Sequence, residues 1–243
     1  MVEDDFIESL KTLRNLEQRN KELDVEYINM IIQFMKSKIN KEYKTILDAP
    51  CRTALMHEFL RKKGYDVYGV ECRKHIAEKL MMHDDEHYFY SDLRKLKLGR
   101  KFDVILNFYT ALGLYCDDDP LILKNFYEHL NDNGLLILET RHANKLDLGY
   151  KIKIVNDVVI VISEELIGNN KVKFISRAYK QVNDDLYFLA RVENEIKLYT
   201  IDELINMIKD AGFNIEFVFD DLSVVPVVGR DIKSDRVVIV ARK

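Results

Sequence analysis

The sequence is poor in cysteine, proline and glycine, and it contains no tryptophan. There are three cysteines, three prolines and nine glycines among 243 residues. Cys51, Cys72 and Cys116 are odd in number and show no CxxC spacing, so we predict neither a disulfide framework nor a zinc knuckle, as is typical of a reducing cytoplasm. With so little proline, no low-complexity tract and no internal repeat, no linker divides the chain into independent domains.

An excess of positive charge is also missing. The chain has 37 Lys and Arg residues against 41 Asp and Glu, which gives a formal net charge of -4. Proteins that bind nucleic acid depend on a basic surface that gathers phosphates, so we do not expect a nucleic-acid partner. No signal-peptide pattern and no apolar run of membrane-spanning length is found. We therefore expect a cytoplasmic protein without a membrane partner.

Short apolar runs alternate with helical patterns in the first half of the chain. The runs are TILDA, DVYGVE, HYFYSDL, FDVILNF and GLLILET, and the helices expected between them span residues 53–63, 73–82 and 120–130. This alternation is typical of an α/β fold with a Rossmann-like, doubly wound and mostly parallel sheet. We assign residues 41–145 and 198–243 to this domain.

Two further segments have their own patterns. Residues 1–40 carry apolar positions at helical spacing, which predicts N-terminal helices. Between residues 146 and 197 the apolar period falls to two, and Gly168-Asn169-Asn170 and Asn183-Asp184-Asp185 are turn signals. We therefore predict an antiparallel β insertion there. Beyond it, Thr200 and Glu203 form a capping box that begins a helix, and Gly212 ends that helix.

Acidic residues end or follow three of the expected parallel strands. Asp48 ends the first strand, Glu71 ends the second about 20 residues later, and Asp92 follows the third. Taken singly, Asp48 and Glu71 are ordinary helix caps or solvated strand ends. Because parallel strands end at one edge of a sheet, their joint placement favours a ligand with hydroxyls, an exocyclic amine and positive charge. The same carboxylates would repel a nucleotide diphosphate.

The ordered set of motifs resembles the class I S-adenosylmethionine-dependent methyltransferases, especially small archaeal and bacterial members whose first motif reads like DxPCGTG. The resemblance covers residues 44–243, through DAPC, YGVE, SDL, FDVILNFYTALGLY and LYTIDELINMIKDAGF. It implies S-adenosylmethionine as the cofactor and a methyl acceptor, which we expect to be a small molecule. The insertion would then cover the acceptor site, and it also offers a surface for a homodimer.

The resemblance also implies roles for residues at the strand ends. Glu71 would hold the ribose, Asp92 would meet the adenine together with the backbone of Leu93, and Asn107 would lie beside the methionine moiety. Asp48 would order the first loop. The cofactor-binding residues expected on this basis are Asp48, Ala49, Pro50, Arg52, Glu71, Cys72, Asp92, Leu93 and Asn107.

The first loop departs from the family's pattern. Arg52 and Ala54 stand where the family has glycines, whose missing Cβ lets the backbone approach the cofactor. Arg52 must point away from the cofactor or pair with its carboxylate. The departure leaves open a second hypothesis, a binding protein that keeps the fold without catalysis. A nicotinamide-dependent oxidoreductase is a third, and the lack of any GxGxxG disfavours it.

Two residues are candidates for the catalytic step. His142 follows the fifth strand and is the histidine best placed to act as a general base, although a surface histidine is the competing interpretation. Tyr115 would form a wall near the sulfonium, because aromatic faces attract positive charge; otherwise it is ordinary core. His83 and His87 have a spacing that suits a metal in a helix, but the acids between them are typical of a solvated loop. We predict no metal site.

Overall fold

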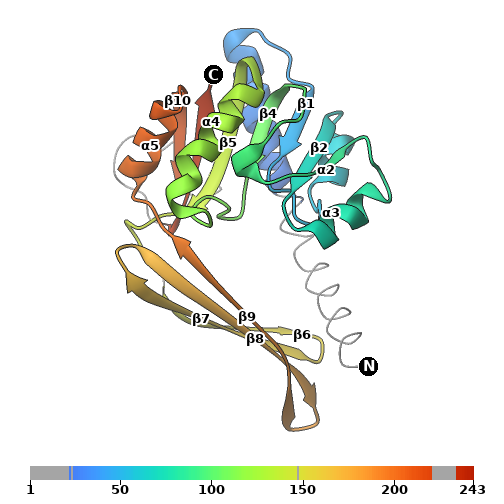
Figure 1. Cartoon of the computed structure of the whole chain (residues 1–243), viewed down its shortest axis with the longest axis vertical. Helices are drawn as coiled ribbons and strands as arrows, with labels where there is room; N and C mark the ends of the chain where they lie inside the picture. The colour runs from blue at the N-terminus through green and yellow to red at the C-terminus, as the bar shows by residue number, and fades with distance from the viewer. Residues whose placement is uncertain (1–21, 23, 147, 221–233) are drawn as a thin grey trace. The chain divides into compact units, whose positions relative to one another are not determined.

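The computed structural model describes residues 22, 24–146, 148–220 and 234–243. The described residues before Leu146 and after Leu198 form one compact unit, which we call the core unit. Those from Leu146 to Leu198 form a second, the insertion unit (Figure 1). The first of the expected N-terminal helices lies outside the described residues, whereas residues 24–39 form a helix.

A seven-stranded sheet forms the centre of the core unit (Figure 1). Its strands lie in the order β10 (Asn214–Asp220), β11 (Arg236–Arg242), β5 (Leu130–Arg141), β4 (Phe102–Asn107), β1 (Thr45–Asp48), β2 (Asp66–Glu71) and β3 (Tyr88–Tyr90). The five strands from β5 to β3 are parallel, and β11 runs antiparallel to both β5 and β10. The predicted Rossmann-like, mostly parallel sheet is thus confirmed. Strand order reverses between β1 and β4, where ligands bind in such sheets.

Four labelled α-helices connect the strands of this sheet. α2 (His57–Lys62) is shorter than the predicted helix over residues 53–63, because Arg52 and Ala54 adopt left-handed φ angles of 52° and 57° and delay the start of the helix. At α5, the predicted capping box of Thr200 and Glu203 is confirmed. The other two helices are α3 (Lys74–Met81) and α4 (Asp119–His129), and α5 itself spans Ile201–Asp210. Among the described helices, none has the length and hydropathy needed to span a membrane.

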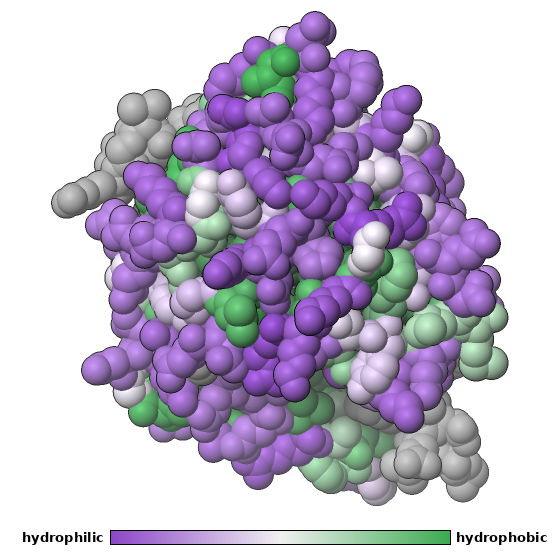
Figure 2. Space-filling view, turned by 45° about the horizontal axis from the view of Figure 1, so that its top comes forward, coloured by the Kyte–Doolittle hydropathy of each residue, from purple (hydrophilic) through white to green (hydrophobic). Residues whose placement is uncertain are grey.

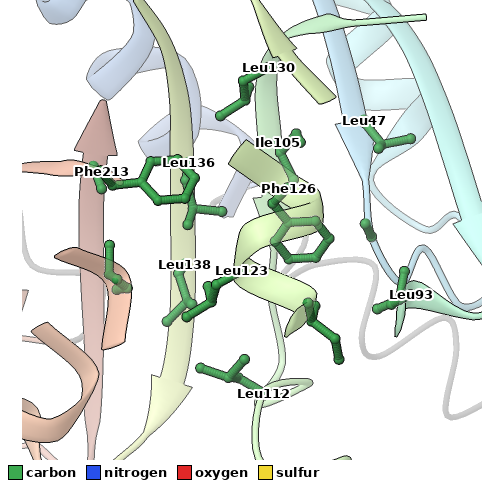
Figure 3. Close-up of a cluster of buried hydrophobic side chains, with 14 of the residues drawn as sticks. Leu47, Leu93, Ile105, Leu112, Leu123, Phe126, Leu130, Leu136, Leu138 and Phe213 are labelled. Atoms are coloured by element: carbon green, nitrogen blue, oxygen red, sulfur yellow. The ribbon is translucent and has the colours of Figure 1, made fainter. Parts of the chain in front are cut away.

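Hydrophilic residues predominate on the face shown in Figure 2, and apolar side chains occur there in small separate groups. The apolar side chains of the core unit pack instead on both faces of the sheet. Figure 3 shows one of these layers, in which Phe126 of α4 lies over Ile105 of β4 and Leu136 of β5. Helix 24–39 covers the other face with Ile28 and Met35. Burial of each such side chain contributes about 1.5–3 kcal/mol to the free energy of unfolding. The packed core thereby holds the strands, and so the residues at their ends, in position.

The insertion unit is a four-stranded antiparallel sheet, which confirms the predicted β insertion. Its strands follow one another in chain order: β6 (Gly149–Val155), β7 (Val158–Gly168), β8 (Lys171–Val182) and β9 (Asp185–Lys197). Asn156, Asn170 and Asn183 take left-handed φ angles of 54° to 56° in its turns. Asparagine tolerates this conformation better than most residues. The positions of these asparagines therefore determine where the strands end and the turns begin.

Candidate functional site

Two of the three predicted acids, Asp48 and Glu71, lie with Asn107 at the carboxyl edge of the parallel strands. Asp48 at the end of β1 lies opposite Gly69 of β2 and Leu106 of β4. Glu71 ends β2, and Asn107 ends β4. Asp48, Glu71 and Asn107 are all buried, with 4%, 1% and 1% of their surfaces exposed. The point at which strand order reverses therefore carries two carboxylates and an amide.

Backbone hydrogen bonds hold the first loop, residues 49–54, against both neighbouring strands. The N–H of Ala49 donates to the carbonyl oxygen of Leu106 on β4, and that of Cys51 donates to Val70 on β2, both at 2.9 Å. Asn107 adds a side-chain bond, because its Nδ2 donates to the carbonyl oxygen of Ala49 at 2.6 Å. Its Oδ1 receives no hydrogen bond from any described residue. The loop is fixed, and a buried acceptor beneath it remains open.

Asp48 bonds to His57, a residue that sequence reasoning missed. The Nε2 of His57 lies 3.2 Å from Asp48 Oδ2, and its Nδ1 lies 3.0 Å from the hydroxyl of Tyr88. A neutral imidazole that donates from Nε2 and accepts the Tyr88 O–H at Nδ1 satisfies both contacts. Gly69 was the available signal, since a Cβ there would lie 2.9 Å from His57 Cε1 and 2.7 Å from Cys51 Sγ. A glycine on β2 thus makes room for the imidazole.

Arg52 and Ala54 keep a backbone conformation that suits glycine. Their φ angles of 52° and 57° lie in the left-handed region, which costs a residue with a Cβ about 1 kcal/mol. The side chain of Arg52 is exposed, and its guanidinium carbon lies 5.9 Å from the centre of the Tyr109 ring. It forms no ion pair within the described ranges. The glycines are replaced here, but the backbone takes a conformation that glycine adopts without strain.

Glu71 is held by Arg73. The backbone N–H of Arg73 donates to Oε1 at 2.9 Å, and its guanidinium donates from Nε to Oε1 and from Nη2 to Oε2, each at 3.0 Å. Cys72 Sγ lies 3.5 Å from Oε1. Burial alone would raise the pKa of Glu71, but the hydrogen bonds and charge of Arg73 outweigh it and lower that pKa. The carboxylate therefore stays ionised.

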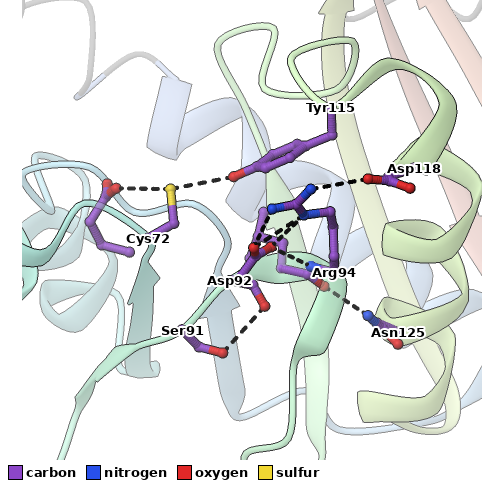
Figure 4. Close-up of polar contacts among 9 residues, drawn as sticks. Cys72, Ser91, Asp92, Arg94, Tyr115, Asp118 and Asn125 are labelled. Carbon is purple, nitrogen blue, oxygen red and sulfur yellow. Dashed lines mark hydrogen bonds and ion pairs between the residues drawn. The ribbon is translucent and has the colours of Figure 1, made fainter.

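Asp92 has an equivalent partner in Arg94 (Figure 4). It accepts the backbone N–H of Arg94 at 2.9 Å and the guanidinium Nη2 at 2.6 Å, and Arg94 also donates to Asp118 at 3.1 Å. These hydrogen bonds lower the pKa of Asp92. Leu93 is buried, and its carbonyl oxygen accepts a bond from Asn125 at 2.8 Å. The loop after β3 is thereby fixed by its own ion pairs.

Tyr115 joins these two acidic groups (Figure 4). Its hydroxyl donates to Cys72 Sγ at 3.3 Å, and the guanidinium of Arg94 lies 5.4 Å from the centre of its ring. Burial, followed by the neighbouring thiol, raises the pKa of Tyr115, so its phenol is neutral. The geometry suits a wall residue rather than a proton-transfer group.

His142 is buried, with 1% of its surface exposed, so it is not the surface histidine of the competing interpretation. Its Nε2 lies 3.1 Å from the carbonyl oxygen of Ser234, an acceptor, so Nε2 carries the proton. Burial lowers the pKa of His142. Its Nδ1 has no partner in the part of the chain that the structure describes. The ring is neutral near pH 7, with a lone pair on Nδ1.

Tyr109 lies just after β4, in the aromatic segment that the sequence places near the sulfonium, but sequence reasoning missed its carboxylate partners. Tyr109 and Thr110 both have left-handed φ angles, 63° and 54°, and strained backbone of this kind clusters at functional sites. The N–H of Tyr109 donates to Glu139 Oε2 and its hydroxyl donates to Asp24 Oδ2, each at 2.6 Å. Asp24 lies 85 residues away on helix 24–39, so only the tertiary fold reveals this contact.

The histidines considered as metal ligands do not form a metal cluster. His87 bonds to carboxylates through both ring nitrogens, to Asp84 at 2.8 Å and to Asp66 at 3.2 Å. Over the described ranges, no group of three or more His, Cys, Asp or Glu residues has the geometry to hold a metal ion.

Comparison with known sequences matches this chain to a family model and to a curated relative. A family model described as a methyltransferase domain matches residues 16–217. A dTDP-3-amino-3,4,6-trideoxy-alpha-D-glucopyranose N,N-dimethyltransferase of Streptomyces venezuelae is 27% identical over 105 residues, which are 40% of this chain and 43% of the relative. The match to that relative therefore spans less than half of its length.

Comparison with solved structures supports the same fold. An S-adenosylmethionine-dependent methyltransferase from Clostridium acetobutylicum has a TM-score of 0.73 at 20% identity, covering 92% of this chain and 91% of that one. DesVI of Streptomyces venezuelae also has a TM-score of 0.73, at 18% identity and with coverage of 93% and 94%. CalS10 of Micromonospora echinaspora, an amino pentose methyltransferase solved with bound S-adenosylmethionine, has 0.73 at 16% identity, with coverage of 94% of each chain. At these identities the likeness establishes the fold.

Proposed function

This chain belongs to the methyltransferase domain family, and from that membership we propose that it transfers the methyl group of S-adenosylmethionine to a small-molecule acceptor. The observation that carries the proposal is the buried Oδ1 of Asn107, which lacks a hydrogen-bond donor among the described residues. Leaving such an acceptor unsatisfied costs about 1–3 kcal/mol. The ammonium group of a bound methionine moiety would supply the missing donor.

The remaining acceptors at this edge suit the rest of the same ligand. Oδ2 of Asp48 bonds to His57, and Oδ1 accepts no bond from a described residue, so it is a second partner for the ammonium group. Oε2 of Glu71 accepts one bond, from Arg73, and retains a lone pair for a ribose hydroxyl. We assign the adenine to Asp92 and the backbone of Leu93. Ala49, Pro50 and Cys72 would line the same cofactor site.

The proposed chemistry asks little of the protein beyond alignment. When bound, the cofactor supplies a methyl group already activated by the sulfonium. The protein orients the two reactants, excludes water and, for some acceptors, removes a proton. His142 has a neutral ring with a lone pair on Nδ1, which is the state that a general base requires. We assign it that role, with Tyr115 as a wall residue near the transferred methyl group.

An amine is the acceptor group that we propose to test first. The curated relative is an N,N-dimethyltransferase of an amino sugar, and CalS10 is an amino pentose methyltransferase. In this chain, two buried carboxylates lie around Tyr109, close to the end of β4: Asp24, and Glu139, which is ion-paired with Arg236. A carboxylate beside the reaction site would attract an amine in its cationic form.

Three further assignments are proposals of the same kind. We assign residues 146–197 to recognition of the acceptor, with a homodimer as the assembly. The free thiols of Cys51 and Cys72 agree with action in the cytoplasm. Size-exclusion chromatography with light scattering would measure the assembly, and a monomer at micromolar concentration would exclude the homodimer.

Calorimetry with S-adenosylhomocysteine tests the cofactor assignment. We expect the full-length protein to bind it, and Asn107→Ala to weaken binding about tenfold while the circular dichroism spectrum stays that of a folded protein. Mass spectrometry with a panel of amino sugars then tests for methylated product. A folded wild-type protein that gives no heat at high concentration would support the second hypothesis, a binding protein without catalysis.

A further inference from the structure

The positive charge of Arg52 has no carboxylate partner among the described residues. Its guanidinium is exposed beside the ring of Tyr109, at a distance of 5.9 Å from the ring centre. Other arginines at or just after the ends of strands at this edge are paired with acids. Arg73 bonds Glu71, Arg94 bonds Asp92 and Arg141 bonds Asp235.

Arg52 also occupies a position at which its backbone is strained. A φ angle of 52° costs a residue with a Cβ about 1 kcal/mol that glycine avoids. Residues held in such conformations cluster where the strain serves a ligand or a switch. A charged side chain at this point of the first loop therefore calls for a function that glycine does not provide.

Hydrogen-bond acceptors that lack a donor lie next to the same loop, at the ends of β1 and β4. Oδ1 of Asn107 is buried without a donor, and Asn107 bonds the loop directly through the carbonyl oxygen of Ala49. Oδ1 of Asp48 likewise accepts no hydrogen bond from a described residue. Tyr109, over which Arg52 lies, follows Asn107 by two positions in the chain. One cation without a carboxylate partner in the loop thus accompanies two acceptor oxygens without donors at the adjoining strand ends, among the described residues.

We propose that Arg52 binds the carboxylate of the cofactor's methionine moiety, while Asp48 and Asn107 accept hydrogen bonds from its ammonium group. This inference rests on the proposed function and adds that the first loop recognises the amino-acid end through a side chain. A guanidinium donates two parallel N–H bonds to a carboxylate, which neither glycine nor alanine at this position can do. Arg52 is then a specificity-determining residue that selects ligands bearing a carboxylate.

Three related ligands test the inference by calorimetry. S-adenosylmethionine carries both charges of the amino acid, and decarboxylated S-adenosylmethionine lacks only the carboxylate. 5′-Methylthioadenosine, a neutral thioether, lacks the whole amino-acid end together with the sulfonium charge. We expect the wild-type protein to prefer S-adenosylmethionine over the decarboxylated compound by about tenfold or more. Arg52→Gly should abolish this preference and leave the affinity for 5′-methylthioadenosine unchanged.

Thermal unfolding and a matched variant separate binding from folding. Arg52→Gly relieves the left-handed strain, so we expect an unfolding temperature equal to or above that of the wild type, together with weaker binding. Arg100→Ala is the control, because the guanidinium of Arg100 also lies over a ring, 4.0 Å from the centre of Tyr68, before the start of β4. It should leave all three affinities unchanged.

Two results would overturn the inference. One is an Arg52→Gly protein that still prefers S-adenosylmethionine over the decarboxylated compound, and the other is an equal loss of affinity for all three ligands. A wild-type protein that binds none of the three would overturn the proposed function as well, so the two failures are distinguishable.

Discussion

Both carboxylate oxygens of Glu71 bond to the guanidinium of Arg73, two residues further along the chain, and each bond is 3.0 Å long. The acid that we assign to the ribose therefore has an internal partner before any ligand arrives. A ribose hydroxyl must share Oε2 with Arg73 or replace it there. The affinity of the site for its ligand therefore depends on the difference in free energy between the bonds of Glu71 to Arg73 and its bonds to the ribose.

Removing the charge of Glu71 should weaken cofactor binding. We expect Glu71→Gln to reduce the affinity for S-adenosylhomocysteine by about tenfold or more, because bonds from hydroxyls to a carboxylate are stronger than those to an amide. Calorimetry measures the effect. Glu86→Gln, a change at an exposed turn residue, is the control and should bind as the wild type does. Equal affinities for the two variants would mean that the ribose lies elsewhere.

The pair of Glu71 and Arg73 should also make stability depend on pH. Arg73 lowers the pKa of Glu71 in the folded protein, so the stabilisation is present above the unfolded pKa of about 4.3 and is lost as pH falls through the lower folded value. In Arg73→Ala, burial without the arginine should raise that pKa and penalise the ionised form at neutral pH. The difference in unfolding temperature between wild type and variant should therefore be largest near pH 7 and shrink toward pH 3. A difference that is constant over this range would contradict the assignment.

Replacing Ala54 with glycine should make the folded protein more stable. Its φ angle of 57° favours a residue without a Cβ, so we expect Ala54→Gly to stabilise the protein by about 0.5–1 kcal/mol in urea unfolding. The same substitution in a helix has the opposite sign. Ala77→Gly in α3 should destabilise by about 1 kcal/mol or more, since Ala77 is buried and helical. Destabilisation by both variants would show that the left-handed strain at Ala54 is not the dominant effect.

His57 should control the orientation of Asp48. His57→Leu leaves Asp48 Oδ2 and the Tyr88 hydroxyl without partners, at a cost of about 1–3 kcal/mol for each buried group. We expect lower stability and weaker binding of S-adenosylhomocysteine. His57→Gln keeps one donor and one acceptor, so it should recover most of the binding. In an Asp48→Asn background the effect of His57→Leu on binding should shrink, and an undiminished effect would show that His57 does not act through Asp48.

Local patterns in the sequence were sufficient for the elements and the strand-end acids. Apolar runs and turn residues predict the parallel sheet, the insertion and the capped helix α5, because each depends on neighbouring residues. The partners of Glu71 and Asp92 were also within reach. Both acids are followed by an arginine at the second position, in Glu71-Cys72-Arg73 and Asp92-Leu93-Arg94. This repeated spacing was a signal that went unused.

Contacts that depend on the packing of distant segments were beyond sequence reasoning. His57 reaches Asp48 only because the left-handed residues before α2 delay the helix and Gly69 leaves space on β2. Tyr109 meets Asp24 across 85 positions, so no local period or motif records it. Contacts of this kind form only when distant segments pack together, so they are seen in the folded structure and not in local sequence patterns.

The arginines after β2 and β3 serve as counter-ions that the chain carries with it. Because they are tethered two positions from the acids they neutralise, dilution does not remove them, unlike cations from solution. Glu71 and Asp92 are thus each compensated by a positive charge within the chain itself. The protein does not depend on a ligand to keep these two carboxylates ionised and folded in place.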